Sequence, residues 1–253
     1  MHYLISFSTK VIACLVILTA FSPGQNSAAD FTRLLRQPSL GEKHIVFTYG
    51  SDLWIAERTA GLARRLTSTP AVESDPHLSP DGNWVAFTSN RSGVRAIYVL
   101  PIQGGTPKRL TWYPASDSAR GWTRDGKGIL YASTRETAPS SYERLWVVPA
   151  TGGASKRLPA PFGHDGCFSE NGKQLVVEPV TRWDTEWRQY RGGQNKSLII
   201  LDLNDLSELL IPCQRTTDTQ PIWIGSKIYF LSDRDGVVNL WTFDTDNKGL
   251  EQI

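Results

Sequence analysis

The residues best suited to ligand chemistry lie in one segment, residues 182–193, which reads Arg-Trp-Asp-Thr-Glu-Trp-Arg-Gln-Tyr-Arg-Gly-Gly. A guanidinium group can stack on an aromatic ring, and it can hold a carboxylate with two hydrogen bonds. The segment combines three arginines with three aromatic rings. It therefore predicts a binding site for a peptide carboxylate, with four candidate substrate-binding residues: Arg182, Arg188, Tyr190 and Arg191.

The same segment has a purely structural interpretation. It also carries Asp184 and Glu186, which can form salt bridges with Arg188 and Arg191 and so fasten the loop between neighbouring structural units. Loops that contain both signs of charge commonly satisfy their own charges. The sequence leaves both interpretations open.

No catalytic residue is predicted. The chain has no Gly-x-Ser-x-Gly turn, in which a serine nucleophile is typically presented. His44, His77 and His164 occupy strand or turn positions, where packing or turn roles are expected. His164 and Cys167 do not form a predicted Cys/His pair, because residues three apart on an extended strand point to opposite faces.

No metal or cofactor is predicted either. Residues 244–249 begin like an EF-hand loop, but Lys248 stands where an oxygen ligand is needed, so a hairpin turn is expected. No metal-ligand spacing, phosphate-binding loop or basic aromatic stripe occurs.

These residues must be positioned by a repeated β unit. A turn glycine recurs before a short apolar run at spacings of 41, 44, 46 and 53 residues, at Gly41, Gly82, Gly126, Gly172 and Gly225. Within the clearest unit, residues 84–88 and 96–100 are apolar on both faces, so both faces of the small sheet must be covered. Radially stacked four-stranded sheets meet that requirement.

The sequence therefore predicts an all-β fold, a β-propeller of four-stranded antiparallel blades. Five blades are counted, and the fifth is expected to be incomplete. The expected blades span these residues: 38–67, 74–111, 117–158, 165–213 and 218–253. Because a closed ring must bring its last blade against its first, either five blades close with strain or the chain is part of a larger propeller, and the sequence favours the larger propeller.

Two sets of motifs resemble known families. Ser79-Pro80-Asp81-Gly82, together with the closing Lys108-Arg109-Leu110-Thr111, resembles the WD40-like repeats of the TolB propeller. The opening Gly50-Ser51-Asp52-Leu53-Trp54 and the insertion at 182–193 resemble the amino-terminal propeller of tricorn-type proteases. In that family a six-bladed propeller precedes a seven-bladed one, a PDZ domain and a serine-peptidase core, so the resemblance implies that the five blades counted here are part of a six-bladed propeller.

The tricorn resemblance implies a non-catalytic module that gates or channels peptides to a catalytic domain of the same protein. The implied partners are peptides or unfolded polypeptide and the downstream domains, with a homo-oligomer left open. The parent protein would be a serine peptidase, and this chain alone would not be an enzyme. A stand-alone TolB-like binding propeller and the cap of a prolyl-oligopeptidase-type hydrolase are the alternatives.

Residues 1–29 predict a signal peptide. An apolar run at 11–21 is followed by the small residues Ser27-Ala28-Ala29, so cleavage is expected before Asp30, leaving a propeller domain at 30–253 in the periplasm or outside the cell. The alternative, a retained membrane helix, needs roughly 20 apolar residues. Cleavage removes Lys10 and no acidic residue, which leaves 26 basic against 25 acidic side chains and argues against a nucleic-acid partner.

The two cysteines beyond the leader are expected to be free thiols. Cys167 is placed in an innermost strand and Cys213 in an outermost strand of the same blade. Three strand spacings separate such positions by roughly 14 Å, whereas a disulfide needs Cα atoms within about 7 Å.

Overall fold

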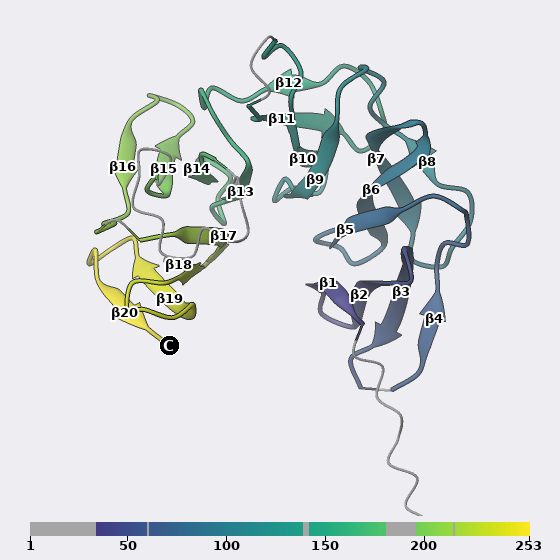
Figure 1. Cartoon of the computed structure of the whole chain (residues 1–253), viewed down its shortest axis with the longest axis horizontal. Helices are drawn as coiled ribbons and strands as arrows, with labels where there is room; N and C mark the ends of the chain where they lie inside the picture. Colours follow the sequence, from purple (N-terminus) through teal and green to yellow (C-terminus); the bar gives the residue numbers. More distant parts are fainter. Residues whose placement is uncertain (1–33, 60, 139–141, 181–195, 215) are drawn as a thin grey trace, which may run out of the picture. The chain divides into compact units, whose positions relative to one another are not determined.

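The structure is a computed structural model that describes residues 34–59, 61–138, 142–180, 196–214 and 216–253. These residues form one compact unit of β-strands. They contain no helix, and hence none that could span a membrane. The strands form five separate four-stranded antiparallel sheets, as predicted, and each sheet is built from four consecutive strands (Figure 1).

The strands of the first three blades have the following bounds. Blade one contains β1 (Arg36–Leu40), β2 (His44–Tyr49), β3 (Asp52–Glu57) and β4 (Ala63–Arg65). Blade two contains β5 (Glu73–Leu78), β6 (Trp84–Ser92), β7 (Val94–Pro101) and β8 (Lys108–Arg109). Blade three contains β9 (Asp117–Trp122), β10 (Gly128–Ser133), β11 (Arg144–Pro149) and β12 (Lys156–Arg157).

Blade four contains β13 (Asp165–Phe168), β14 (Gln174–Glu178), β15 (Ile199–Asp202) and β16 (Glu208–Leu210). Blade five contains β17 (Asp218–Ile224), β18 (Lys227–Ser232), β19 (Asn239–Asp244) and β20 (Leu250–Gln252). The sequence predicts an incomplete fifth blade; the structure instead gives it four strands, and β20 is as long as β4 and β16.

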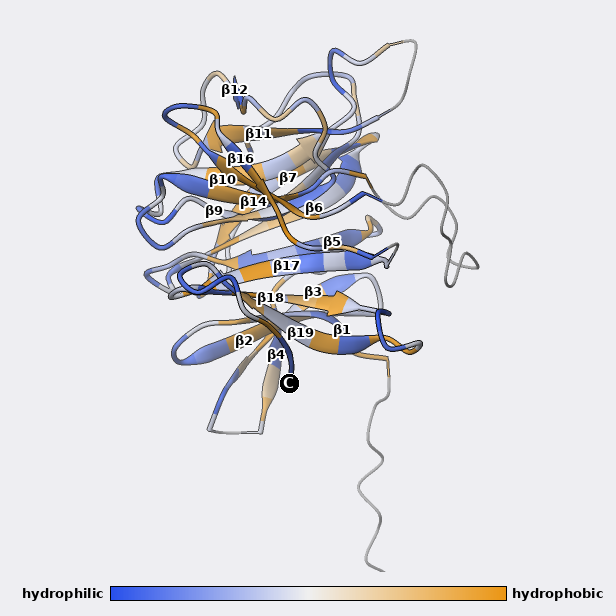
Figure 2. Cartoon of the chain, turned by 90° about the vertical axis from the view of Figure 1, so that its left-hand side faces the viewer, coloured by the Kyte–Doolittle hydropathy of each residue, from blue (hydrophilic) through white to orange (hydrophobic). Residues whose placement is uncertain are grey.

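The core of the protein lies between the blades. Four buried apolar clusters each combine side chains from two consecutive blades. Tyr98, Trp146 and Trp241 of the third strands contribute to them, and Tyr98 and Trp146 are almost fully buried. In Figure 2 the hydrophobic colours concentrate on the strands, whereas the connecting turns are largely hydrophilic. Burial on both faces explains why β6 and β7 read as continuous apolar runs.

The first strand of each blade is the innermost one (Figure 1). The first strand also makes most of the contacts with the preceding blade: β5 packs on blade one, β9 on blade two, β13 on β9, and β17 on β13 and β14. Among the described strands, none of these main contacts joins the fifth blade to the first. The innermost strands are therefore the elements that bring polar residues of successive blades together.

Candidate functional site

A bulge interrupts most of the innermost strands. The pairing register shifts within β1, β5, β9 and β17, whereas β13 pairs regularly with β14. A bulge leaves backbone groups outside the ladder of the sheet and turns the local side chain in a new direction. At these positions φ is positive for Gln37 (51°), Asp75 (51°) and Gln220 (55°), which side-chain-bearing residues seldom adopt. Such conformations persist only where other contacts hold them.

Those contacts come from the preceding blade. The backbone N–H of Asp75 donates to Oε1 of Gln37 at 3.1 Å. In the same way, the N–H of Ala119 donates to Oγ1 of Thr88 at 2.9 Å. The N–H of Gln220 donates to Oε2 of Glu178 at 2.9 Å. The bulged strands β5, β9 and β17 thus each have a backbone donor that is satisfied by a side chain of the blade before them.

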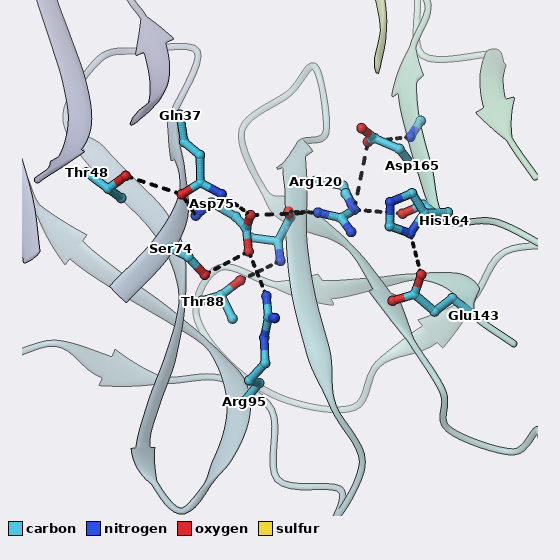
Figure 3. A network of polar contacts seen from close by, with 12 residues as sticks. Gln37, Thr48, Ser74, Asp75, Thr88, Arg95, Arg120, Glu143, His164 and Asp165 are labelled. Atoms are coloured by element: carbon cyan, nitrogen blue, oxygen red, sulfur yellow. Dashed lines mark hydrogen bonds and ion pairs between the residues drawn. The ribbon is translucent and has the colours of Figure 1, made fainter. Parts of the chain in front are cut away.

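The carboxylate of Asp75 lies at the centre of the polar contacts among blades one, two and three (Figure 3). Its Oδ1 accepts a hydrogen bond from Nε2 of Gln37 at 2.8 Å. Its Oδ2 accepts hydrogen bonds from Ser74 at 3.0 Å and from Arg95 at 3.1 Å. Asp75 also lies 3.9 Å from Nη1 of Arg120. One carboxylate therefore joins blades one, two and three.

Arg120 continues the contacts into blade four (Figure 3). Its Nε donates to the carbonyl oxygen of His164 at 2.6 Å and lies 4.0 Å from Oδ1 of Asp165. Only 14% of the Arg120 side chain is exposed. Because a guanidinium offers five donors in a rigid plane, one arginine can satisfy acceptors on two neighbouring blades.

In blade four the polar contacts involve two carboxyl groups, those of Asp165 and Glu178. Burial raises the pKa of Asp165, although the charge of Arg120 opposes that shift. Burial, followed by the charge of Asp165, raises the pKa of Glu178 to about 7. Glu178 is 5% exposed and sits opposite Asp165 in the β13–β14 pair. Glu178 therefore keeps its proton to a higher pH than an exposed glutamate does.

We call these side chains the inner-strand network and define it as Gln37, Asp75, Arg120, Asp165, Glu178 and Gln220. It crosses all five blades and contains both signs of charge. It includes no serine, cysteine or threonine beside a base. Within the described part of the chain, no cluster of three His, Cys, Asp or Glu side chains could hold a metal ion. Chemically, the network can bind polar groups and fasten blades to each other.

The predicted substrate-binding residues Arg182, Arg188, Tyr190 and Arg191 lie outside the described residues. His164 is predicted to be a packing or turn residue; the structure instead pairs its Nδ1 with the carboxylate of Glu143 (Figure 3).

Sγ of Cys167 accepts a hydrogen bond from the backbone N–H of Trp223, whereas His164 pairs with Glu143. Cys167 and His164 therefore do not form a Cys/His pair. Cys167 and Cys213 are free thiols, as predicted. Cys213 follows β16 and is not part of a strand.

Sequence reasoning missed the inner-strand network, although a signal was present. In each blade a polar residue precedes proline or glycine in the innermost strand, in the pairs Gln37-Pro38, Asp75-Pro76, Arg120-Gly121, Asp165-Gly166 and Gln220-Pro221. The polar members are spaced by 38, 45, 45 and 55 residues, close to the blade period. A search for turn glycines passes over this repeat, because three of the pairs contain proline.

The fold and the network define the class of the protein, a β-propeller fastened blade to blade by its innermost strands. The chain belongs to the family of tricorn protease N-terminal beta propeller domains, whose sequence profile matches residues 32–253. It is 34% identical over 228 residues to tricorn protease homolog 1 of Streptomyces coelicolor, covering 86% of this chain and 20% of that protein. It is 26% identical over 228 residues to the tricorn protease of Thermoplasma acidophilum, covering 87% of this chain and 21% of the relative.

Solved structures share the fold. The crystal structure of the tricorn protease superimposes with a TM-score of 0.74 at 24% identity, over 87% of this chain and 22% of that one. A putative TolB from Agrobacterium tumefaciens superimposes with a TM-score of 0.70 at 20% identity, over 87% of this chain and 80% of that one. The chain spans about a fifth of the length of the curated tricorn relatives it matches.

Proposed function

We propose that this chain is the non-catalytic propeller module of an exported tricorn-like serine peptidase and that its ring gates peptides on their way to a catalytic domain outside this chain. The family match supports the first part, because residues 32–253 align with the N-terminal propeller of proteins named tricorn protease. The inner-strand network supports the second part, because it supplies polar groups from every blade.

The charges of the inner-strand network favour the passage of peptides over their tight binding. Its carboxylates and its guanidinium are directed at one another and at backbone groups, as the contacts of Asp75 and Arg120 show. A surface whose charges are already paired offers a passing peptide few strong contacts. Peptides of varied sequence can then move past it without being held.

The test compares two substrates in the peptidase that contains this propeller. Gln220→Arg places a larger, charged side chain at a bulge while keeping the backbone N–H that bonds to Glu178. We expect hydrolysis of an unfolded, reduced polypeptide to slow by about threefold or more and hydrolysis of a short fluorogenic peptide to stay nearly constant. Glu170→Gln, at an exposed position of the blade-four turn, is the control. Equal effects on both substrates would contradict gating.

The chain by itself is expected not to hydrolyse peptides. Purified protein free of its parent peptidase should show no turnover of a fluorogenic peptide above a buffer blank. Reproducible turnover that co-purifies with this chain would refute a purely non-catalytic role.

The arginine-rich segment is part of the proposal as a peptide-carboxylate site formed by Arg182, Arg188, Tyr190 and Arg191. Changing Arg188 and Arg191 to glutamine should weaken binding of peptides with a free carboxyl terminus and leave binding of their amidated forms unchanged. If both peptide forms lose affinity equally, the arginines act on the loop and not on the carboxylate.

Export is proposed from the leader at residues 1–29. The mature protein should begin at Asp30 and should occur in the periplasmic or secreted fraction. Amino-terminal sequencing of the protein from each cell fraction decides this point. An intact leader on cytoplasmic protein would contradict it.

A second candidate function is a stand-alone binding propeller of the TolB kind. The likeness to the putative TolB structure favours it, because that likeness extends over 80% of the other chain. This function requires that the chain act without a peptidase. Expression of this chain alone in a deletion strain separates the two: rescue of an envelope defect supports the binding propeller, and failure to rescue supports the peptidase module.

A further inference from the structure

A groove of about 350 Å³ lies between blades two and three, at their outer strands. One wall is the link from β8 to β9, with Trp112 and Tyr113, and the other is the segment 153–155 before β12. Tyr131 and Arg135 also line it. A volume of this order accepts one large side chain together with its neighbours. The groove is formed by the link after β8, the link before β12, Tyr131 of β10 and Arg135 just after β10, and none of these residues belongs to the inner-strand network.

The aromatic pair in this groove is not required by the turn that carries it. The same turn occurs one blade earlier, as Leu66-Thr67-Ser68-Thr69-Pro70 in place of Leu110-Thr111-Trp112-Tyr113-Pro114. Both turns close in the same way: Oγ1 of Thr67 accepts from a β3 N–H at 2.9 Å, and Oγ1 of Thr111 accepts from a β7 N–H at 3.0 Å.

Serine and threonine therefore suffice at the two variable positions of this turn. In blade two those positions carry a tryptophan that is 73% exposed and a tyrosine that is 42% exposed. The matched turn of blade one closes without aromatic residues, so the exposed pair in blade two is not needed to form the turn. Exposed aromatic side chains of this size gather at binding sites, so the pair indicates a ligand-binding role.

A comparison of the two blades also singles out Arg109. Arg65 in blade one and Arg109 in blade two donate Nε to equivalent carbonyl oxygens, those of Thr67 at 2.8 Å and Thr111 at 2.7 Å. Arg65 then forms an ion pair with Asp52.

Blade two has Ala96 at the position equivalent to Asp52. Among the described residues, no carboxylate lies within ion-pair distance of Arg109. Its guanidinium lies instead 4.4 Å from the ring centroid of Trp112. A cation on an aromatic face keeps its hydrogen-bond donors available for a carboxylate.

Arg135 adds a second cation inside the groove. Its guanidinium lies 4.7 Å from the ring centroid of Tyr113 and 4.5 Å from that of Trp146. Its Nε has no hydrogen-bond partner, although Glu136 lies 3.6 Å away as an ion-pair neighbour.

The strands that bound the groove, β8 and β12, are both Lys-Arg pairs. Glu136 pairs with both Arg135 and Arg157, and the charge of Asp117 acts on Arg109 and Arg135. Five basic side chains of β8, β12 and Arg135 therefore face these two acidic ones, and the local charge is positive, which fits an acidic ligand.

We infer that this groove binds an extended peptide segment in which an aromatic residue lies next to acidic residues. The aromatic side chain enters between the wall that carries Trp112 and Tyr113 and the wall formed by residues 153–155, where offset or edge-to-face contacts with the two rings are available. The neighbouring carboxylates pair with Arg109 and Arg135. Binding at this groove requires neither transit through the ring nor an active peptidase.

The test uses the purified full chain and a short fluorescein-labelled peptide with the core Glu-Phe-Glu, followed by fluorescence anisotropy at low salt. Two matched peptides replace the glutamates with lysine or the phenylalanine with alanine. The wild-type chain should bind the first peptide saturably and should bind each matched peptide at least about tenfold more weakly. No saturable binding, or equal binding of all three peptides, overturns the proposal.

The variant that decides the site copies the turn of blade one, Trp112→Ser with Tyr113→Thr. Because this protein already folds that turn with serine and threonine, circular dichroism and the melting temperature should be unchanged. Affinity should fall by about tenfold or more, and Arg109→Gln should lower it by roughly threefold to tenfold. Unchanged affinity in a folded turn-copy variant overturns the site.

The converse variant, Ser68→Trp with Thr69→Tyr, serves as the control. It places the aromatic pair beside Arg65, which is already paired with Asp52. The stoichiometry should remain one peptide per chain. A second site of equal affinity would show that aromatic rings alone recruit the peptide and would overturn the role given to Arg109.

Discussion

Glu178 should make the protein less stable as the pH rises from acid to neutral. Its carboxyl is buried, and burial with the nearby charge of Asp165 raises its pKa from 4.5 to about 7. The unfolded chain has the ordinary pKa, so between these two values the folded state holds a proton that the unfolded state has lost. Stability therefore falls through this window and is constant above it with respect to this group.

The size of the effect follows from the width of the window. At about 1.4 kcal/mol per pH unit, a shift from 4.5 to about 7 corresponds to a loss of roughly 3 kcal/mol in the free energy of unfolding. Glu178→Gln removes the titration and keeps an oxygen that can accept the N–H of Gln220. The variant should match the wild type near pH 5 and exceed it by about 2–3 kcal/mol near pH 8.

Urea unfolding followed by tryptophan fluorescence measures this difference across the pH range. Titrating groups that do not interact with Glu178 occur in both proteins and cancel in the comparison, whereas Asp165 is coupled to Glu178 and contributes to the same difference. Glu170→Gln is the control, because Glu170 is exposed on the same blade, and its difference from the wild type should not change with pH. A difference between Glu178→Gln and the wild type that stays constant from pH 5 to pH 8 would refute the reasoning.

Three further changes test the contacts between blades by urea unfolding. Thr88→Val leaves the buried N–H of Ala119 without its acceptor and should cost about 1–3 kcal/mol, whereas Thr88→Ser keeps the hydroxyl and should cost less. Arg120→Met removes the contacts to blades two and four and should cost about 3 kcal/mol; a loss below about 1 kcal/mol would show that the ion pairs are not structural. Gly166→Ala places a methyl group 2.7 Å from a backbone carbonyl oxygen and should cost about 2 kcal/mol or more, whereas Gly61→Ala meets no neighbour and should be neutral.

The blade architecture was accessible from the sequence because its signals are local. Gly82, Gly126 and Gly172 each have positive φ in a strand-linking turn, which glycine permits without strain. The strands that follow these glycines, β6, β10 and β14, are apolar on both faces, because blades two, three and four each have a neighbouring blade on both sides. Turn chemistry and burial therefore agree, and their agreement determines a repeated four-stranded unit.

The inner-strand network was not accessible in the same way. Gln37, Asp75 and Gln220 break the apolar pattern of a strand, so a period-two interpretation assigns them to turns. A bulge shifts the register at each of them, which alternation along a single strand cannot reveal. Their partners lie on other blades and are therefore distant in sequence. Only the recurrence of a polar residue before proline or glycine indicates that these positions are equivalent.

The exception among the innermost strands explains the one arginine in the network. Where β5, β9 and β17 are bulged, a backbone N–H is left outside the ladder, and the blade before it provides an acceptor. The strand β13 has no bulge, and the N–H of Gly166 in this strand already donates to Oδ1 of Asp165 at 2.7 Å. A side-chain acceptor from blade three would have no donor there.

In the contact between blades three and four, the preceding blade therefore supplies the hydrogen-bond donor and not the acceptor. Arg120 acts as the donor, and the carbonyl oxygen of His164 accepts. Its positive charge also offsets the burial of Asp165 in the acidic pair beside it. The side chain that each blade offers to the next therefore follows from whether the next innermost strand presents a free donor or a free acceptor. A bulge introduced into β13 should make an acceptor preferable to Arg120 at this position.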